Sequence, residues 1–286
     1  MKRILIAALG FIVLFTSVGC DKKNNYVGLQ LYSVRQYMEP LPDALQKVAG
    51  AGYQFVELAS YDAGKFYGQS PAEFKALAKA AGLDVLCSHT GGPNPNKASH
   101  QECIDWWKEA VDAHAAAGCI AIVAPGMGYE AFQSPAGLQA YCDLYNEVGE
   151  MCAAKGMKFG YHNHHSEFTT LFVLQDGSRI SVYDYMLQNT DPEKVFFQLD
   201  LYWCWRAGEN PVEVIKANPG RFFLWHVKDE VEVGASGQID FPEIYKYAKL
   251  SGMKYQIVEQ EAYAEGADPF ESVKVSCDYV KTMRPQ

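Results

Sequence analysis

Short apolar runs alternate with longer amphipathic segments along most of the chain. The runs are rich in β-branched and aromatic residues, which favour strands. The segments between them repeat apolar positions with the period of a helix. The runs predict strands at 26–31, 53–58, 84–88, 120–124, 158–163, 195–199, 222–227 and 255–258.

Residues typical of helix ends punctuate the amphipathic segments. Pro42-Asp43 opens one helix that closes at 50–52, and Ser70 to Glu73 opens another that closes at Gly82. Further helices are predicted at 99–117, 134–155, 181–189, 211–217 and 241–251, and a last one follows Asp268-Pro269.

Eight strands that alternate with helices predict a single (β/α)₈ barrel over residues 26–286. The competing fold is a doubly wound open sheet. That fold usually has fewer strands, and no GxGxxG follows the first strand here. In a barrel of this kind the chemistry lies at the C-terminal ends of the strands, so polar residues at those ends are the candidates for a site.

The N-terminus resembles an export signal. Lys2 and Arg3 precede an apolar run at 4–15 that is too short to span a bilayer comfortably, and small residues lead to Cys20. We expect a signal peptide over 1–19, a lipid anchor on Cys20 and a polar tether over 20–25, which would place the protein in the periplasm or on a membrane. The alternative is ordinary signal cleavage and a soluble periplasmic protein.

Composition narrows the functional classes. Hydrophobic residues make up 49% of the chain, which is enough for a large core and excludes a disordered protein. The formal net charge of −9 argues against a general nucleic-acid partner, which would need a basic face. The cysteines after Cys20 are scattered without a CxxC pair, so most are expected to be small buried residues.

Four consecutive predicted strands end in residues that bind divalent metals: His162, Asp200, His226 and Glu259. Each follows a strongly apolar stretch, where an unpaired charge would be costly to bury. Mixed imidazole and carboxylate ligands suit Mn²⁺, Zn²⁺, Co²⁺ or Fe²⁺, and they suit Mg²⁺ less well. The alternative is that each residue is satisfied separately, for example in a buried His–Asp pair.

Several motifs at the strand ends form a recognisable set: the segment 28–35, Tyr161-His-Asn-His with Glu167-Phe168, Asp200 followed by Trp203, His226-Val-Lys-Asp229, the segment 237–241 and Val258-Glu259-Gln260. With this set the chain resembles one family, the xylose-isomerase-like TIM barrels known as sugar phosphate isomerases/epimerases. The resemblance implies that one divalent cation is bound, with Mn²⁺ as the leading candidate. The family's ligand positions correspond to His162, Asp200, His226 and Glu259 in this chain. Many relatives have Glu where this chain has His162, so Glu167 is the alternative ligand from the fifth strand.

The resemblance also implies a metal-dependent isomerase or epimerase that acts on a keto-sugar through an enediolate. Glu259 is the predicted acid/base on one face of the substrate, and the other face falls to His162, His164 or Glu167. This asymmetry keeps open β-elimination, which is seen in relatives that act on 3-keto-glycosides. Lys228 is predicted to stabilise the enediolate charge, or else to form a salt bridge with a neighbouring carboxylate.

Further residues are expected to contact the substrate. Glu57 and His89 end the second and third strands and are predicted to bind sugar hydroxyls, although His89 would equally cap a loop. Trp203 is predicted to stack on a sugar ring, or else to pack in an aromatic cluster. Asp229, Glu230 and Glu232 would repel a phosphate near the loop after the seventh strand, which favours an unphosphorylated sugar.

Two other functional classes compete with this interpretation. A metal-dependent phosphodiesterase of the endonuclease IV type would share the barrel, but it resembles a three-zinc site with a basic groove. A non-catalytic sugar-binding lipoprotein would bind carbohydrate with or without a chelator. The sequence makes no prediction about the oligomeric state.

Overall fold

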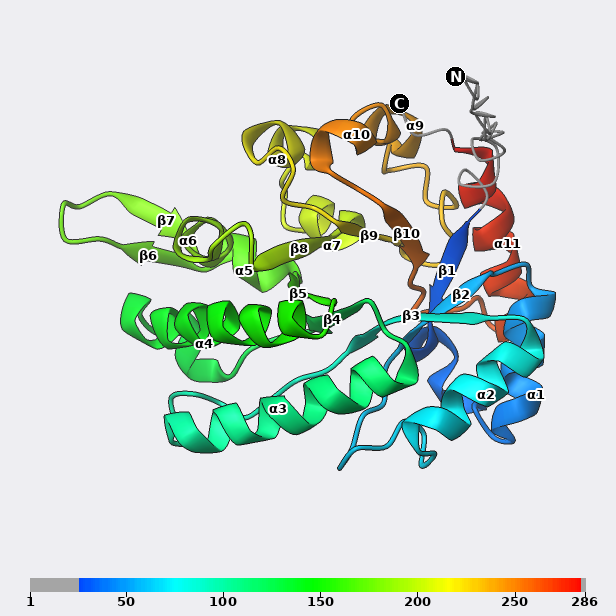
Figure 1. Cartoon of the computed structure of the whole chain (residues 1–286). Coiled ribbons are helices and arrows are strands. Elements are labelled where there is room, and N and C mark those ends of the chain that lie inside the picture. The colour runs from blue at the N-terminus through cyan, green and yellow to red at the C-terminus, as the bar shows by residue number, and fades with distance from the viewer. Residues whose placement is uncertain (1–25, 284–286) are drawn as a thin grey trace, which may run out of the picture.

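Eight parallel strands form a closed barrel in the computed structural model, which describes residues 26–283 (Figure 1). The strands are β1 (Val27–Gln30), β2 (Phe55–Leu58), β3 (Asp84–His89), β4 (Ala121–Ala124), β5 (Lys158–His162), β8 (Val195–Asp200), β9 (Leu224–Val227) and β10 (Tyr255–Val258). They follow one another around the barrel in chain order, and β10 pairs with β1 to close it. The predicted barrel is confirmed. The predicted signal peptide, Cys20 and the tether lie outside the described residues.

Helices surround the barrel and cover the outer faces of its strands (Figure 1). They are α1 (Leu41–Gly50), α2 (Pro71–Ala81), α3 (His100–Ala117), α4 (Pro135–Ala154), α5 (His165–Thr169), α6 (Val182–Asn189), α7 (Leu201–Arg206), α8 (Pro211–Ala217), α9 (Phe241–Tyr245), α10 (Ala248–Ser251) and α11 (Pro269–Thr282), with 3-10 turns η2 (Leu31–Tyr37) and η3 (Tyr129–Phe132). Among the described residues, no helix combines the length and the apolar character that crossing a membrane requires.

Local sequence accounts for the predicted helix ends. Ser70 and Ser99 each accept a hydrogen bond from the backbone of a glutamate three residues later, and that glutamate bonds back to the serine. The two helices end at Gly82 and Gly118, both in the left-handed conformation that glycine adopts without a steric penalty.

The structure differs from the predicted elements in several places. The single helix predicted at 241–251 is two helices, α9 and α10, because Tyr247 leaves the helical conformation with φ −101° and ψ 7°. An antiparallel hairpin, β6 (Leu171–Val173) and β7 (Arg179–Ser181), extends from the barrel and was not predicted (Figure 1). Its strands are too short for a period-two pattern to stand out.

Two apolar cores hold the fold together. The larger one lies between the strands and the helices, and the smaller one fills the barrel interior with Phe55, Leu86, Cys87, Ala121, Val123, Phe196, Leu224 and Ile257. Gly28 and Gly160 lie against the rings of Phe55 and Phe196, where a Cβ would collide with the ring. The seven described cysteines are all buried and free, as expected for small apolar residues.

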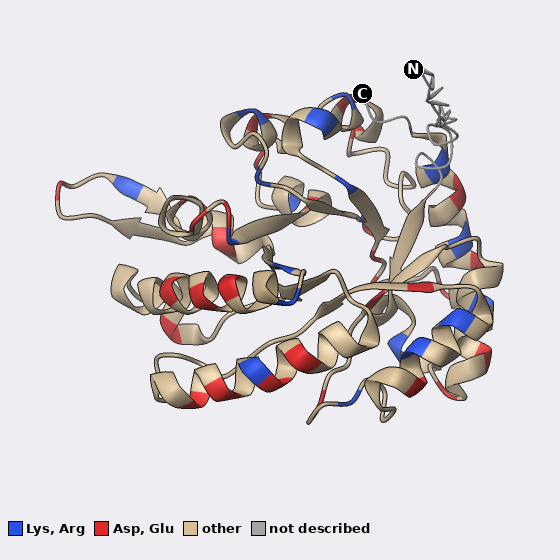
Figure 2. Cartoon of the chain, viewed as in Figure 1, with Lys and Arg blue, Asp and Glu red and all other residues tan. Residues whose placement is uncertain are grey.

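The acidic excess of the chain lies largely on the outer helices. Figure 2 marks acidic residues along α3 and α4, and the sequence of these helices includes Asp105, Glu109, Glu147 and Glu150. Solvent and salt screen these surface charges, so they have little electrostatic effect on the barrel interior. Charges inside the barrel have no such solvent, so they must be compensated locally.

Candidate metal and active site

The period-two alternation of the strands builds the site directly above the apolar core of the barrel. Phe196 and Leu224 belong to that core, and two residues further along the same strands lie Gln198 and His226. Glu259 follows Ile257 in the same way at the end of β10. Because residues i and i+2 of a strand point to the same face, each strand changes from packing to polar chemistry within one step.

The four predicted metal ligands come together at this level. One ligand atom each from His162, Asp200, His226 and Glu259 lies within 4.8 Å of the others, and all four residues are buried. His162 Nε2 lies 3.4 Å from Asp200 Oδ2. His226 Nδ1 lies 3.4 Å from Glu259 Oε2 and 3.8 Å from Asp200 Oδ2. The residues therefore face one common point.

His226 is oriented from behind by Glu57. Its Nε2 lies 2.5 Å from Glu57 Oε2, which leaves Nδ1 pointing toward Asp200 and Glu259. Glu57 also accepts hydrogen bonds from Gln30 Nε2 and Gln198 Nε2, each at 2.8 Å. Carboxylates behind a metal-binding histidine fix its tautomer in this manner.

Two observations show that the cluster fits a cation. Nδ1 of His162 and Nδ1 of His226 are buried without a hydrogen-bond partner among the described residues. Around the cluster three buried carboxylates, Glu57, Asp200 and Glu259, are faced by one buried ammonium group, that of Lys228. A divalent cation at the common point would supply the missing positive charge and use the free Nδ1 of His226, which faces Asp200 and Glu259.

The pKa values reflect the same shortage of positive charge. Burial, reinforced by Glu259 and opposed by Lys228, raises the pKa of Asp200 to about 7. Burial opposes the charged ring of His226, but Glu57 and Glu259 outweigh it and raise its pKa to about 10. In the absence of a cation, a proton on His226 therefore compensates the neighbouring carboxylates.

Asp200 is fixed at the junction of β8 and α7. Its Oδ1 caps the helix by accepting from the Trp203 amide at 2.7 Å, while its own amide donates to Asn163 Oδ1 at 3.0 Å. Asn163 Nδ2 also donates to the Asp200 carbonyl at 3.3 Å. These bonds leave Asp200 Oδ2 directed toward His162 and His226.

Lys228 lies beside Glu259 and links it to a more exposed carboxylate. Its Nζ is 3.1 Å from Glu259 Oε2 and 2.8 Å from Glu261 Oε1. Burial opposes the charge of Lys228, but Glu259, Asp200 and Glu261 outweigh it and raise the pKa of the lysine. Burial also opposes ionisation of Glu259, yet His226 and Lys228 hold its pKa well below the ordinary value. Both groups are charged at neutral pH.

A cavity of about 370 Å³ opens above the cluster; we call it the metal-site cavity. Its walls are formed by Tyr32, Ala59, Tyr61, His89, Thr90, Gly91, Pro125, His162, His164, Glu259 and Glu261. His89 Nε2 lies 2.7 Å from Gln198 Oε1, so the residue is held at the wall by a side-chain contact rather than by capping a loop. A cavity of this size accepts a small polar ligand such as a sugar.

Three residues predicted to contact the substrate lie behind the cavity walls. Glu57 is fully buried and its carboxylate is engaged by the contacts described above. Glu167 accepts from the Tyr161 hydroxyl at 2.6 Å and from the His164 amide at 3.0 Å, outside the metal cluster. Trp203 packs beside His164 and within 5.2 Å of Lys228 Nζ. These three residues therefore do not line the metal-site cavity, and of the two candidates from the fifth strand it is His162, and not Glu167, that lies in the four-residue cluster.

Sequence reasoning missed Gln30, Gln198, Asn163 and Glu261. The Gln30 amide donates to Glu57, the Gln198 amide contacts His89, and the Asn163 amide accepts from the backbone of Asp200. Glu261 pairs with Lys228. A period-two signal was present for two of them, since Gln198 precedes Asp200 by two residues and Glu261 follows Glu259 by two. Gln30 and Asn163 lie at strand ends without such a pairing.

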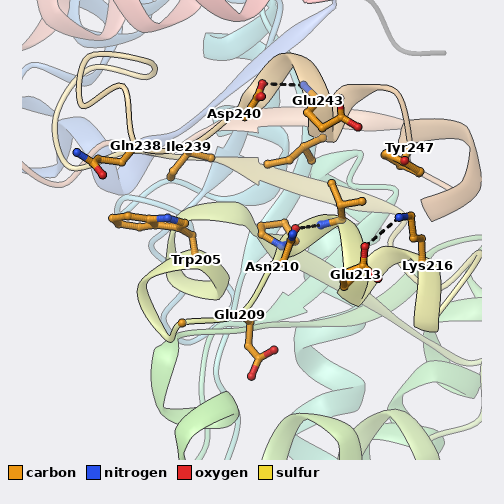
Figure 3. A pocket seen from close by; sticks show the side chains of 14 residues that line it. Trp205, Glu209, Asn210, Glu213, Lys216, Gln238, Ile239, Asp240, Glu243 and Tyr247 are labelled. Carbon is orange, nitrogen blue, oxygen red and sulfur yellow. Dashed lines mark hydrogen bonds and ion pairs between the residues drawn. The ribbon is translucent and has the colours of Figure 1, made fainter.

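A second hollow, of about 440 Å³, lies between α8 and α9, away from the cluster. Figure 3 shows Trp205 and Ile239 on its walls. Several polar groups there are engaged in local structure. Asn210 and Asp240 accept from the Val212 and Glu243 amides, and Lys216 pairs with Glu213 (Figure 3). This groove lacks the converging ligands of the metal-site cavity.

Comparisons with known proteins agree with this architecture. A solved sugar phosphate isomerase/epimerase from Parabacteroides distasonis ATCC 8503 is 31% identical, with a TM-score of 0.82 over 94% of this chain and 98% of that one. An L-ribulose 3-epimerase structure is 13% identical, with a TM-score of 0.70 over 90% of this chain and 93% of that one, a likeness that shows the fold alone.

A curated relative, inosose dehydratase from Clostridium botulinum (strain Alaska E43 / Type E3), is 28% identical over 160 residues. That match spans 48% of this chain and about half, 51%, of the relative's length. The names of these relatives describe sugar-modifying enzymes: a sugar phosphate isomerase/epimerase, an epimerase and a dehydratase. The family described as xylose isomerase-like TIM barrel matches residues 45–283, and the chain belongs to that family.

Proposed function

We propose that this protein is a divalent-metal-dependent isomerase or epimerase that acts on an unphosphorylated keto-sugar. The observation that carries the proposal is the set of four buried ligands at the floor of a sugar-sized cavity. The solved sugar phosphate isomerase/epimerase that is 31% identical to this chain supports the reaction class.

His162, Asp200, His226 and Glu259 would hold the metal. Their mixture of imidazole and carboxylate groups favours Mn²⁺, and Zn²⁺, Co²⁺, Fe²⁺ and Mg²⁺ are alternatives. When bound, the ion supplies Lewis-acid polarisation of the keto group, which acidifies the neighbouring C–H bond.

Glu259 is the proposed base. It is ionised, and it lines the cavity, so it is placed to remove the proton on the carbon next to the keto group. Lys228 lies 3.1 Å from Glu259 and supplies a fixed positive charge that favours the negative charge developing on the substrate. The lysine orients its neighbour and counters charge, and it does not need to lose its proton.

The opposite face of the substrate would meet histidine. His162 and His164 both line the cavity, and their rings are 4.8 Å apart in an edge-on arrangement. A proton returned from this side after removal by Glu259 inverts the stereocentre, which is epimerisation. A proton returned to the adjacent oxygen-bearing carbon gives aldose–ketose isomerisation.

Elimination is the second candidate function. The two sides of the cavity are chemically unequal, with a carboxylate facing imidazoles. Burial, reinforced by His226 and His89, lowers the pKa of His162 well below its ordinary value, so His164 is the proposed group for protonating a leaving group. The curated relatives named inosose dehydratase carry out a dehydration according to their name. Loss of water or of an aglycone from a keto-glycoside would use the same base, Glu259.

The charges around the cavity favour an uncharged substrate. Its walls carry the carboxylates of Glu259 and Glu261 and, within the described part of the chain, no lysine or arginine. Among the described residues, a phosphate dianion would therefore find no lysine or arginine on these walls to bind it. Comparable activity on a sugar phosphate and on its dephosphorylated form would contradict this part of the proposal.

We also propose that the protein is exported and carries a lipid on Cys20. The support is the order of basic, apolar and small residues at 1–19. The expected outcome is that a Cys20→Ser variant moves from the membrane to the soluble fraction on cell fractionation. Equal membrane association of the two proteins would contradict a lipid anchor.

The decisive experiment is solvent deuterium exchange into keto-sugars, including D-fructose and L-ribulose, with the Mn²⁺-loaded protein in D₂O. Exchange with an intact carbon skeleton supports isomerase or epimerase chemistry, whereas loss of water or an aglycone supports elimination. Turnover should stop on chelation. Sugar binding that persists without exchange, with and without chelator, would instead indicate a non-catalytic sugar-binding protein.

A further inference from the structure

A second cavity adjoins the metal-site cavity, and we call it the loop cavity. It measures about 350 Å³ and is lined by the segments that follow β3 and β4, together with Trp107, Tyr141 and Tyr145 from α3 and α4. Pro125 lines both cavities, and Gly91 of the metal-site cavity is followed directly by Gly92 of the loop cavity. A ligand longer than one sugar ring would therefore pass from one cavity into the other.

Gly91 and Gly126 line the passage between the two cavities, and nothing in the surrounding part of the described structure requires glycine at either position. A Cβ added to Gly91 or Gly126 would meet no atom within 4 Å, and neither residue has the positive φ that favours glycine. The chain itself therefore does not require glycine at these positions. Their missing side chains leave open space beside the backbone, as expected where a ligand approaches closely.

The floor of the loop cavity offers two unused hydrogen-bond donors. Trp107 is 1% exposed, and its indole Nε1 has no partner among the described residues. The Tyr141 hydroxyl accepts from the Gly128 amide at 2.7 Å, and its own proton reaches no acceptor in the described structure. A buried donor without an acceptor costs about 1–3 kcal/mol, a cost that a ligand oxygen would remove.

The loop cavity is uncharged. Among residues 26–283, none of those that form its walls is Asp, Glu, Lys or Arg, and the walls combine buried aromatic side chains with Pro93, Asn94 and Met127. Donors set in a neutral, partly aromatic wall suit a ring that carries oxygen acceptors and has apolar C–H faces. A sugar residue has both features.

We propose that the loop cavity is a subsite for the second, non-reacting sugar ring of a glycosidic substrate. The reacting keto-sugar would occupy the metal-site cavity, and the second ring would lie along Gly91 and Gly126 with its oxygens on Trp107 Nε1 and Tyr141. This inference rests on the proposed function for the first ring, and it makes the substrate disaccharide-sized. Binding of the second ring would raise affinity without entering the chemistry.

The test compares D-fructose with the ketose disaccharides turanose, isomaltulose and lactulose on the Mn²⁺-loaded full chain. At least one disaccharide should bind at least about tenfold more tightly than D-fructose by titration calorimetry. Gly126→Leu should remove that advantage and leave D-fructose binding within about twofold, because the new side chain fills the passage and meets no protein atom at its Cβ.

Gly50→Leu is the matched control. Gly50 also has open space around a Cβ and no positive φ, and it lies at the exposed end of α1. This variant should bind every sugar as the parent protein does. Trp107→Phe, which removes the donor and keeps an aromatic ring, should weaken only disaccharide binding, by about three- to tenfold.

The proposal is overturned if no disaccharide binds more tightly than D-fructose, or if Gly126→Leu weakens monosaccharide and disaccharide binding equally. Solvent deuterium exchange separates this outcome from failure of the proposed function. Exchange into D-fructose without a disaccharide advantage removes the subsite and keeps the enzyme. A disaccharide advantage that depends on Gly126 but gives no exchange with any sugar keeps the subsite and removes the enzyme.

Discussion

Two layers of side chains in the barrel interior come from the same strands and differ in every other respect. The lower layer contains Phe55, Phe196, Leu224 and Ile257, and the upper layer contains Glu57, Gln198, His226 and Glu259, each two residues further along. The lower layer gains free energy by excluding water. The upper layer buries charge and is stable only where partners compensate it.

The comparison shows how one barrel separates stability from chemistry. The lower layer needs only shape and apolar surface, so its residues could be exchanged for others of similar volume. The upper layer needs particular atoms at particular points, because Glu57 fixes His226 and Asn163 fixes Asp200. Substitutions in the lower layer should therefore mainly reduce stability, whereas substitutions in the upper layer should mainly reduce activity.

The largest expected effect is on activity in the upper layer. Glu259→Gln keeps the size of the side chain but removes the base, so deuterium exchange should fall by about 10³-fold or more at saturating Mn²⁺. Exchange rates measured by NMR test this expectation. Glu271→Gln, on the exposed surface of α11, is the control and should match the parent protein. A loss of less than about tenfold would remove Glu259 from the role of base.

The next effect is on stability in the lower layer. Leu224→Ala empties part of the barrel interior, where the side chain is fully buried, and should lower the free energy of unfolding by about 2–5 kcal/mol. Urea unfolding measures this change. Leu250→Ala, at a residue that is 44% exposed, should change little. The separation of layers would fail if Leu224→Ala left stability intact and abolished metal binding.

The pH dependence of stability should distinguish a buried histidine outside the metal cluster, His114, from the two histidines within it. His114 has both ring nitrogens partnered, by Thr90 and the Ala110 carbonyl, whereas His162 and His226 each have a free Nδ1. Burial, opposed by the Ala110 contact, lowers the pKa of His114 to about 4. The unfolded chain, with a histidine pKa of about 6.5, therefore binds the proton first as the pH falls.

The neutral His114 thus contributes stability above about pH 6.5, and this contribution of up to about 3 kcal/mol is lost toward pH 4. His114→Gln should reduce the difference between unfolding free energies measured at about pH 7 and about pH 4.5. His100→Gln, on the exposed start of the same helix, is the control. An unchanged pH dependence in the His114 variant would contradict this assignment.

The smallest expected effect has the opposite sign to that of Leu224→Ala. Asp200→Asn removes one of the buried carboxylates and preserves an oxygen for the Trp203 amide. The metal-free protein should therefore become more stable, by about 1–2 kcal/mol, while its Mn²⁺ affinity falls. Thermal unfolding with and without chelator measures both changes. If the metal-free variant is instead less stable than the parent protein, the unfavourable interaction of Asp200 with Glu259 is not a significant cost to the fold.

The sequence predicted the barrel because each strand is an apolar run bounded by clear helix ends. Ser70 with Glu73 marked a helix start that the structure confirms. The short helices α5 and α7 were not predicted, since elements of 5 and 6 residues do not complete a recognisable helical period. The hairpin β6–β7 was missed for the same reason.

The four candidate metal ligands could be picked out from the sequence because His226 and Glu259 interrupt strongly apolar strands, and the structure brings the four residues together. The choice between His162 and Glu167 was not readable. It depends on the turn after β5, where Glu167 folds back to cap α5 and bonds Tyr161. The loop cavity was also beyond sequence reasoning, because it arises where two loops from separate strands face helices α3 and α4.

The most direct test of the central claim is an anomalous difference map from a crystal of the Mn²⁺-loaded protein. The account predicts one strong peak in contact with His162, Asp200, His226 and Glu259. A well-ordered crystal with no peak at that point, or with the ion bound at other side chains, would contradict it.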